Sequence, residues 1–110
     1  MPNKRYRKGY KFEIRVKKFL EGIGYKVYRS AGSKPVDLIA ISNRDVLVIE
    51  CKSSRVTKSS IERLAKEVEG LNVRGLIAFR DGVKKIKFLD VMENREVRLT
   101  PVSKHIDKPL

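Results

Sequence analysis

Two carboxylates and one lysine interrupt segments of the chain that are otherwise apolar. Asp37 precedes Leu-Ile-Ala-Ile, and Glu50 and Lys52 come at the end of Val-Leu-Val-Ile-Glu-Cys-Lys. An ionised carboxylate inside a buried segment is costly unless a cation compensates it. Carboxylate oxygens are the ligands that Mg²⁺ prefers, and Mn²⁺ often replaces it. These residue types therefore favour a magnesium site that hydrolyses its substrate.

The turn sequence Asn43-Arg44 separates these two segments, which we predict to be strands because both are rich in branched apolar side chains. A two-residue loop pairs the strands so that Asp37 lies directly opposite Glu50. Residues in opposite positions share a face, with Cβ atoms roughly 5 Å apart. Alternation along the second strand adds Lys52 to that face. We therefore expect Asp37, Glu50 and Lys52 to form one cluster.

A divalent cation at this cluster would cleave phosphodiesters, because it generates hydroxide from bound water and stabilises the leaving oxygen. Lys52 would steady the attacking water or the charge that develops on the phosphorane. The backbone carbonyl of Cys51 is a further candidate ligand. Glu13 flanks the apolar stripe of the first expected helix and would reach the metal directly or through water. Its simpler alternative is an ion pair with Lys17, four residues later.

Other residues with reactive side chains have ordinary structural explanations. The Cys51 side chain is expected on the face opposite the acids, as a core thiol rather than a nucleophile. Ser33 lies in the loop sequence Ala-Gly-Ser-Lys-Pro, where a serine is by default a turn former. His105 lies near the end of the chain and is expected to be solvated.

Charge is the strongest feature of the composition. The chain has 26 Lys and Arg residues against 13 acidic ones, a net charge of +13. Such an excess favours a polyanionic partner, since each cation near a phosphate releases a bound counterion. A membrane-surface role would need bulky interfacial aromatics, and tryptophan is absent. We therefore expect nucleic acid as the partner, with neither a membrane nor a small-molecule substrate.

The length and cysteine content indicate one domain over residues 1–110, with a flexible tail from about residue 100. A single cysteine excludes an internal disulfide and fits a cytoplasmic location, and one histidine beside that one cysteine argues against a structural zinc site. No apolar run is long enough to span a membrane, and no signal-peptide pattern opens the chain.

Hydrophobic periodicity predicts an α/β fold, a mixed central β-sheet flanked by helices. The first helix is expected over residues 9–24, and a capping box of Ser59 and Glu62 would begin the second. The expected strands cover residues 26–30, 36–41, 46–52, 73–79 and 83–89, the last two joined around Asp81-Gly82, with another short pair within 91–99.

Several of these motifs together resemble the archaeal-type Holliday junction resolvases, a branch of the PD-(D/E)xK nuclease superfamily. The similar pieces cover nearly half of the chain, in order and at compatible spacing. They are Tyr6-Arg7-Lys8-Gly9, Glu13, Arg29-Ser30-Ala31-Gly32-Ser33-Lys34, Val36-Asp37-Leu38 and Ile49-Glu50-Cys51-Lys52. The whole set is much more specific than Glu-x-Lys alone.

The resemblance implies a restriction-endonuclease-like fold and a homodimer that resolves four-way DNA junctions by paired nicks in opposed strands. It assigns the metal to Glu13, Asp37 and Glu50, and assistance of the water to Lys52. Ser33 would enter the active site on a mobile loop, and Arg29 would contact DNA near it. Basic residues before and around the site would contact phosphates, namely Arg5, Arg7, Lys8, Lys11 and Lys34.

The sequence departs from the family at one position that bears on the site. Family members often carry an arginine directly after the helix glutamate, where this chain has Ile14, and Arg15 is a candidate substitute. The segment after Lys52 and the C-terminal part are also short, as in a compact viral relative. The cell would be archaeal, or the host of an archaeal virus or a phage.

Three other functions are compatible with parts of the pattern. The nearest is another nuclease of the superfamily that acts on duplex, flap or damaged DNA. A non-catalytic nucleic-acid binder would explain the charge but not the acid set. A basic ribosome-associated protein would fit the size and charge, yet it gives no account of two acids opposite each other in one hairpin.

Overall fold

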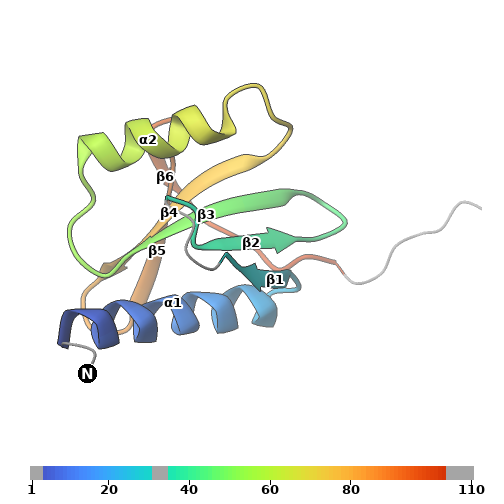
Figure 1. Ribbon diagram of the computed structural model, residues 1–110. Coiled ribbons are helices and arrows are strands. Elements are labelled where there is room, and N and C mark those ends of the chain that lie inside the picture. The colour runs from blue at the N-terminus through green and yellow to red at the C-terminus, as the bar shows by residue number, and fades with distance from the viewer. Residues whose placement is uncertain (1–3, 31–34, 104–110) are drawn as a thin grey trace, which may run out of the picture.

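A computed structural model describes residues 4–30 and 35–103, with side chains from residue 9 onward. Six strands form one sheet in the order β1-β2-β3-β4-β5-β6 (Figure 1). They are β1 (Lys26–Arg29), β2 (Leu38–Ile41), β3 (Val46–Lys52), β4 (Arg74–Asp81), β5 (Lys85–Asp90) and β6 (Arg95–Val97). The strand β3 runs parallel to β4, and the other neighbours are antiparallel. The predicted mixed sheet flanked by helices is confirmed.

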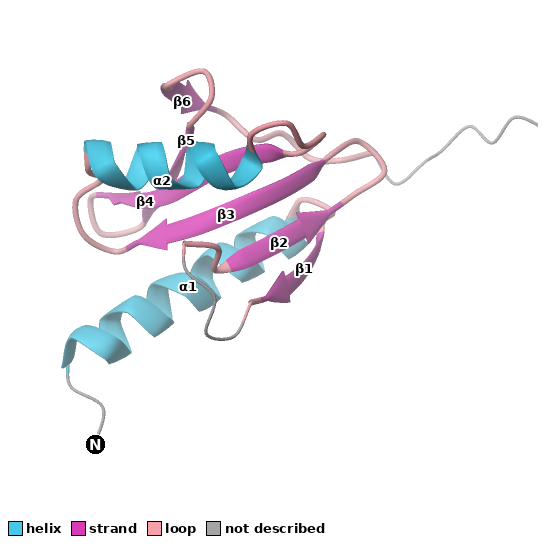
Figure 2. Ribbon diagram, turned by 45° about the horizontal axis from the view of Figure 1, so that its top comes forward, coloured by secondary structure: helices cyan, strands magenta, loops and turns pink. Residues whose placement is uncertain are grey.

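Two helices cover opposite faces of this sheet, α1 (Lys4–Gly22) on one side and α2 (Lys58–Val68) on the other (Figures 1 and 2). The chain needs α2 because a parallel pair such as β3 and β4 requires a crossover connection. The crossover therefore lays α2 over the strand that carries Glu50 and Lys52.

Alternation along β3 divides the core into two layers. Leu47 and Ile49 pack with Val16 and Leu20 of α1, whereas Val48 packs with the cluster around α2. Because side chains alternate along a strand, Glu50 points to the α2 side of the sheet. The position of the acid is thus fixed by the same apolar pattern that builds the core.

The hairpin register predicted from the turn is confirmed. Leu38 pairs with Ile49 and Ile41 with Val46, and the Ser42 N–H donates to the carbonyl of Asp45 at 3.0 Å. Strand β2 begins at Leu38, so Asp37 lies just before it. Extending the same register by one residue places Asp37 opposite Glu50.

Three expectations about element boundaries were wrong. Helix α1 begins at Lys4 rather than residue 9. Helix α2 has its N-cap at Thr57, whose hydroxyl accepts the N–H of Ser60, so the capping box from Ser59 does not form. The segment after β5 contributes one strand, which pairs with β5 instead of forming a pair of its own within 91–99.

The start of the expected C-terminal tail packs against the body of the protein. Val102 is buried in the core, and its N–H donates to the carbonyl of Ile23 at 2.7 Å. The tail prediction otherwise falls on residues 104–110, with His105, which lie outside the described residues. Within the described residues, no helix is long and apolar enough to cross a membrane.

Candidate active site

The predicted site residues gather at one end of the first three strands. Strand β1 ends with Arg29, β2 begins after Asp37, and β3 ends with Glu50 and Lys52 (Figure 2). Antiparallel pairing brings the end of β1, the start of β2 and the end of β3 to the same edge of the sheet. Glu13 joins them from α1.

The Glu50 carboxylate is the most deeply buried acid of this group, at 5% exposure. Its Oε2 lies 3.4 Å from Lys52 Nζ and 3.4 Å from Arg63 Nη2. Its Oε1 is buried and has no hydrogen-bond partner among the described residues. A buried carboxylate oxygen without a partner is costly, because it has lost water and gained nothing in exchange.

Asp37 is held by the backbone of the facing strand. The Cys51 N–H donates to Asp37 Oδ2 at 2.8 Å, and the Asp37 N–H donates to the carbonyl of Ile49 at 2.8 Å. Burial raises the pKa of the Asp37 carboxyl above its ordinary value, and the charges of Glu13 and Glu50 raise it further. The bond from Cys51 acts in the opposite direction. Asp37 is therefore in the electrostatic range of both other acids.

Glu13 forms a two-point ion pair with Arg29. The Nε and Nη2 atoms of Arg29 donate to Glu13 Oε2 at 3.0 and 2.7 Å. The alternative pair with Lys17 is wrong, since Lys17 instead donates to Glu21 at 2.9 Å. The Arg29 guanidinium also lies 4.8 Å from the centre of the Tyr10 ring, at a cation–π distance.

Arg15 points away from this group. Its Nη2 donates to the carbonyl of Lys84, in the turn between β4 and β5, at 3.0 Å. Two residues along a helix correspond to a rotation of about 200°, so Glu13 and Arg15 lie on opposite sides of α1. Arg15 therefore does not occupy the place of the arginine usual after the helix glutamate.

The Cys51 thiol packs against the core layer of α1, on the face opposite Glu50, as predicted. Burial raises the pKa of this thiol far above its ordinary value, and the charges of Asp37, Glu13 and Glu50 reinforce the effect. Because the thiolate is the nucleophilic form, the side chain is chemically inert at neutral pH.

The residues of this site fit a divalent cation, although they are not already arranged around one. Across residues 4–30 and 35–103, no three His, Cys, Asp or Glu side chains form a ready metal-binding group. Glu13 is bound to Arg29, and one oxygen of Asp37 to Cys51. The unpartnered Glu50 Oε1 and the raised pKa of Asp37 both show negative charge that a bound cation would stabilise.

Several predicted residues cannot be placed. Ser33 and Lys34 lie outside the described residues, and so do the side chains of Arg5, Arg7 and Lys8, whose backbone belongs to α1. Of the predicted DNA contacts, Lys11 is exposed on α1, and Arg29 is engaged with Glu13.

Comparison with known proteins gives the family. The family model described as archaeal Holliday junction resolvase (Hjc) matches residues 4–108. The chain belongs to the archaeal Holliday junction resolvase family. The predicted family resemblance is thus confirmed over nearly the whole chain, well beyond the motifs that suggested it.

Two relatives of the resolvase family illustrate the match. The crossover junction endodeoxyribonuclease Hjc of Methanocaldococcus jannaschii is 52% identical over 59 residues, which span 54% of this chain and 44% of that protein. The structure of Archaeoglobus fulgidus Hjc, a Holliday junction resolvase from an archaeal hyperthermophile, superposes with a TM-score of 0.66. It is 24% identical and covers 77% of this chain and 74% of its own, so it supports the fold.

Reasoning from the sequence missed Arg63, the second cation on Glu50 in this member of the resolvase family. It comes from α2, thirteen residues after Glu50. A weak signal was present, because a crossover helix after β3 must cover the face of β3 that carries Glu50. A basic residue beside the buried Leu64 of that helix was therefore a candidate partner.

Proposed function

We propose that this chain is a structure-specific, Mg²⁺-dependent DNA endonuclease that resolves four-way junctions. One observation of the structure carries the proposal, the buried and unpartnered Oε1 of Glu50 beside Asp37, at the end of a Glu-x-Lys strand. Membership of the resolvase family and the names of the relatives support the junction as the substrate. The expected cytoplasmic location stays a prediction.

The site residues have distinct roles in this proposal. Asp37, Glu50 and the Cys51 carbonyl would hold the cation, with Glu13 as a fourth ligand once it leaves Arg29. The cation, Mg²⁺ or Mn²⁺, would supply an activated water and charge stabilisation at the phosphate. Lys52, fixed 3.4 Å from Glu50, would orient that water or neutralise the developing charge.

The proposed active unit is a homodimer, because a four-way junction presents two-fold symmetry and needs two opposed nicks. Ser33 on its loop would complete each site. Basic residues would contact the phosphates of the junction; we assign this role to Arg5, Arg7, Lys8, Lys11, Arg29 and Lys34.

A cleavage assay on a fixed four-way junction tests the activity. We expect Mg²⁺-dependent cutting in wild type and a loss of about a hundredfold or more in Glu50→Gln, since replacing even a residue that only supports a metal ligand costs roughly 10- to 100-fold. Junction binding should be retained, because the substitution spares the phosphate contacts. Glu69→Gln, an exposed change at the end of α2, is the matched control.

The same assay separates the rival functions. Faster cutting of linear duplex or of flaps than of junctions would contradict the resolvase proposal and favour another nuclease of the superfamily. Absence of any cutting in wild type would favour a non-catalytic binder.

A plasmid that extrudes a cruciform tests the dimer, since paired nicks yield linear plasmid and single nicks yield open circles.

A further inference from the structure

The charge balance around Glu50 is unusual for so deeply buried an acid. Two cations, Lys52 and Arg63, lie at the same 3.4 Å distance from the same oxygen, Oε2. The second oxygen, Oε1, is left without a partner among the described residues. The two cations therefore compensate the charge at Oε2 only, and Oε1 is available to a further cation.

The two cations on Oε2 are held very differently. Lys52 belongs to β3 itself, two residues from Glu50, and its side chain is 28% exposed. Arg63 reaches over from α2, and its side chain is 57% exposed. It borders a shallow groove of about 400 Å³ that Pro35, Lys66 and Glu67 also line. Arg63 can therefore leave Glu50 for solvent without disturbing the core.

The contact of Arg63 with Glu50 is also long. At 3.4 Å it exceeds the 2.7–2.9 Å typical of a strong N–H to carboxylate bond. The pair of Arg29 with Glu13 reaches 2.7 Å with two donor atoms. Of the two arginines on the acid group, Arg63 is thus the one held loosely enough to exchange.

We propose that Arg63 is the counter-cation of Glu50 in the metal-free protein and that it competes with the divalent cation for this carboxylate. The inference rests on the proposed metal site and adds a positioning residue to it. Arg63 keeps the Glu50 carboxylate compensated while no metal is bound, and it weakens metal binding because its contact must be given up. It thereby sets the metal concentration at which the site fills.

The test measures Mn²⁺ binding without DNA, by electron paramagnetic resonance of free Mn²⁺ and by the Mn²⁺-induced shift in melting temperature. We expect Arg63→Met to bind Mn²⁺ roughly two- to fivefold more tightly than wild type, the factor that a partly exposed ion pair supplies. The metal-free melting temperature should fall. Arg63→Lys, which keeps the charge, should lie between the two.

A matched control removes the general effect of one lost charge. Arg98→Met makes the same change at an exposed residue on the other side of the sheet, where it lines a pocket with Phe19 of α1. An Mn²⁺ affinity of Arg63→Met no higher than that of Arg98→Met would overturn the role of Arg63. If Glu50→Gln then still abolishes Mn²⁺ binding, the metal site itself stands. A wild type that binds no Mn²⁺ would overturn the proposed metal site and this inference together.

Discussion

At the scale of single residues, the carboxylate of Asp37 has surroundings that shift its pKa in opposite directions. This carboxylate accepts the Cys51 N–H, and it also lies within the field of two other acids. Burial and those charges raise its pKa. The folded protein therefore binds a proton at Asp37 more readily than the unfolded chain, and this contribution to stability is lost as the pH rises through the raised pKa.

Because the pKa of Asp37 is raised in the folded protein, we predict how two Asp37 variants change the free energy of unfolding in the absence of metal. Asp37→Asn keeps the acceptor for Cys51 and removes the charge, so at pH 7 its free energy of unfolding should equal or exceed that of wild type. Asp37→Ala loses the bond and should be less stable than Asp37→Asn by about 0.5–1.5 kcal/mol. Urea unfolding with a chelator measures both. A markedly destabilised Asp37→Asn would contradict the assignment.

Lowering the pH should reduce the difference in free energy of unfolding between wild type and Asp37→Asn. Near the ordinary pKa of an aspartate, the wild-type carboxyl becomes protonated in the fold and no longer suffers repulsion. The same unfolding experiment repeated at about pH 4 and pH 7 gives the comparison, because model aspartates titrate near 3.9. A difference in free energy of unfolding that grows at low pH would show that the charge of Asp37 stabilises the fold.

At the scale of elements, Gly75 of β4 sets how closely α2 approaches the sheet. A Cβ at this position would lie 2.9 Å from a methyl carbon of Val68 and 2.9 Å from one of Val91. Branched side chains are stiff, so neither valine yields easily. We predict that Gly75→Ala lowers the free energy of unfolding by about 1–3 kcal/mol, as overpacking does.

The position of α2 makes this substitution informative about the site. Because α2 carries Arg63, a small displacement of the helix should also weaken the contact with Glu50. Chemical denaturation measures the stability, and Gly22→Ala is the control, since nothing lies within 4 Å of a Cβ there. Equal stability of the two variants would mean that α2 adjusts to the added methyl group without cost.

Local contacts of the site were predictable, and distant ones were not. The Asp37–Glu50 register follows from a short turn, whose chemistry is written in adjacent residues. The partners of Glu13 and Glu50, namely Arg29 and Arg63, depend on how helices settle against the sheet. The N-cap of α2 was predicted wrongly for another reason. Thr57 and Ser59 are both residue types that cap helices, and their spacing alone does not show which of them does so.

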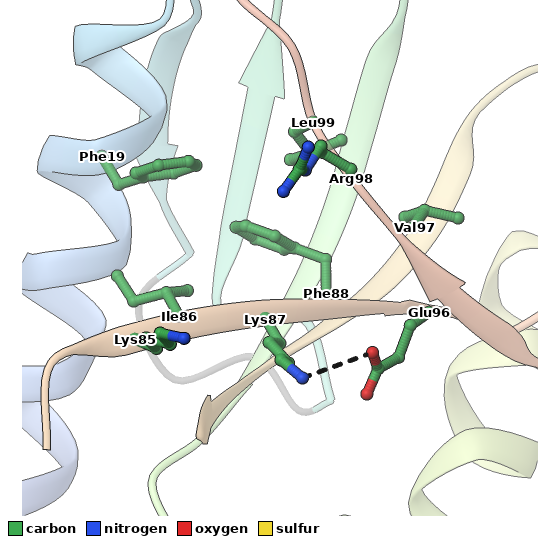
Figure 3. A pocket seen from close by; sticks show the side chains of 9 residues that line it. All are labelled: Phe19, Lys85, Ile86, Lys87, Phe88, Glu96, Val97, Arg98 and Leu99. Atoms are coloured by element: carbon green, nitrogen blue, oxygen red, sulfur yellow. Dashed lines mark ion pairs between the residues drawn. The ribbon is translucent and has the colours of Figure 1, made fainter. Parts of the chain in front are cut away.

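At the scale of the whole molecule, the net charge of +13 is spread over surfaces of different character. Figure 3 shows the side chains around β5, where Phe88 points to one side of the strand, toward Phe19, and Lys87 points to the other, where its ammonium pairs with Glu96 at 3.7 Å. Lys87 also lies 2.9 Å from Asp81. Its charge is thus compensated locally, whereas Lys11 is exposed on α1.

This difference predicts which lysines matter for DNA. Lys11→Gln should reduce the slope of log affinity against log salt concentration by about 0.9, the value for one phosphate contact on duplex DNA. Lys87→Gln should leave the slope unchanged. Fluorescence anisotropy of a labelled junction over a range of salt concentrations measures both. Equal slopes for the two variants would place the DNA elsewhere on the molecule.

The bond between the Asp37 carboxylate and the Cys51 N–H also limits which acid this chain can carry at position 37. Aspartate and glutamate often replace each other at metal sites, since both offer the same oxygens. Here the side chain also holds the facing strand where β2 has not yet begun. A glutamate, longer by one methylene, would have to give up either the strand or the ligand position. Glutamate is therefore not equivalent to aspartate at position 37 of this chain.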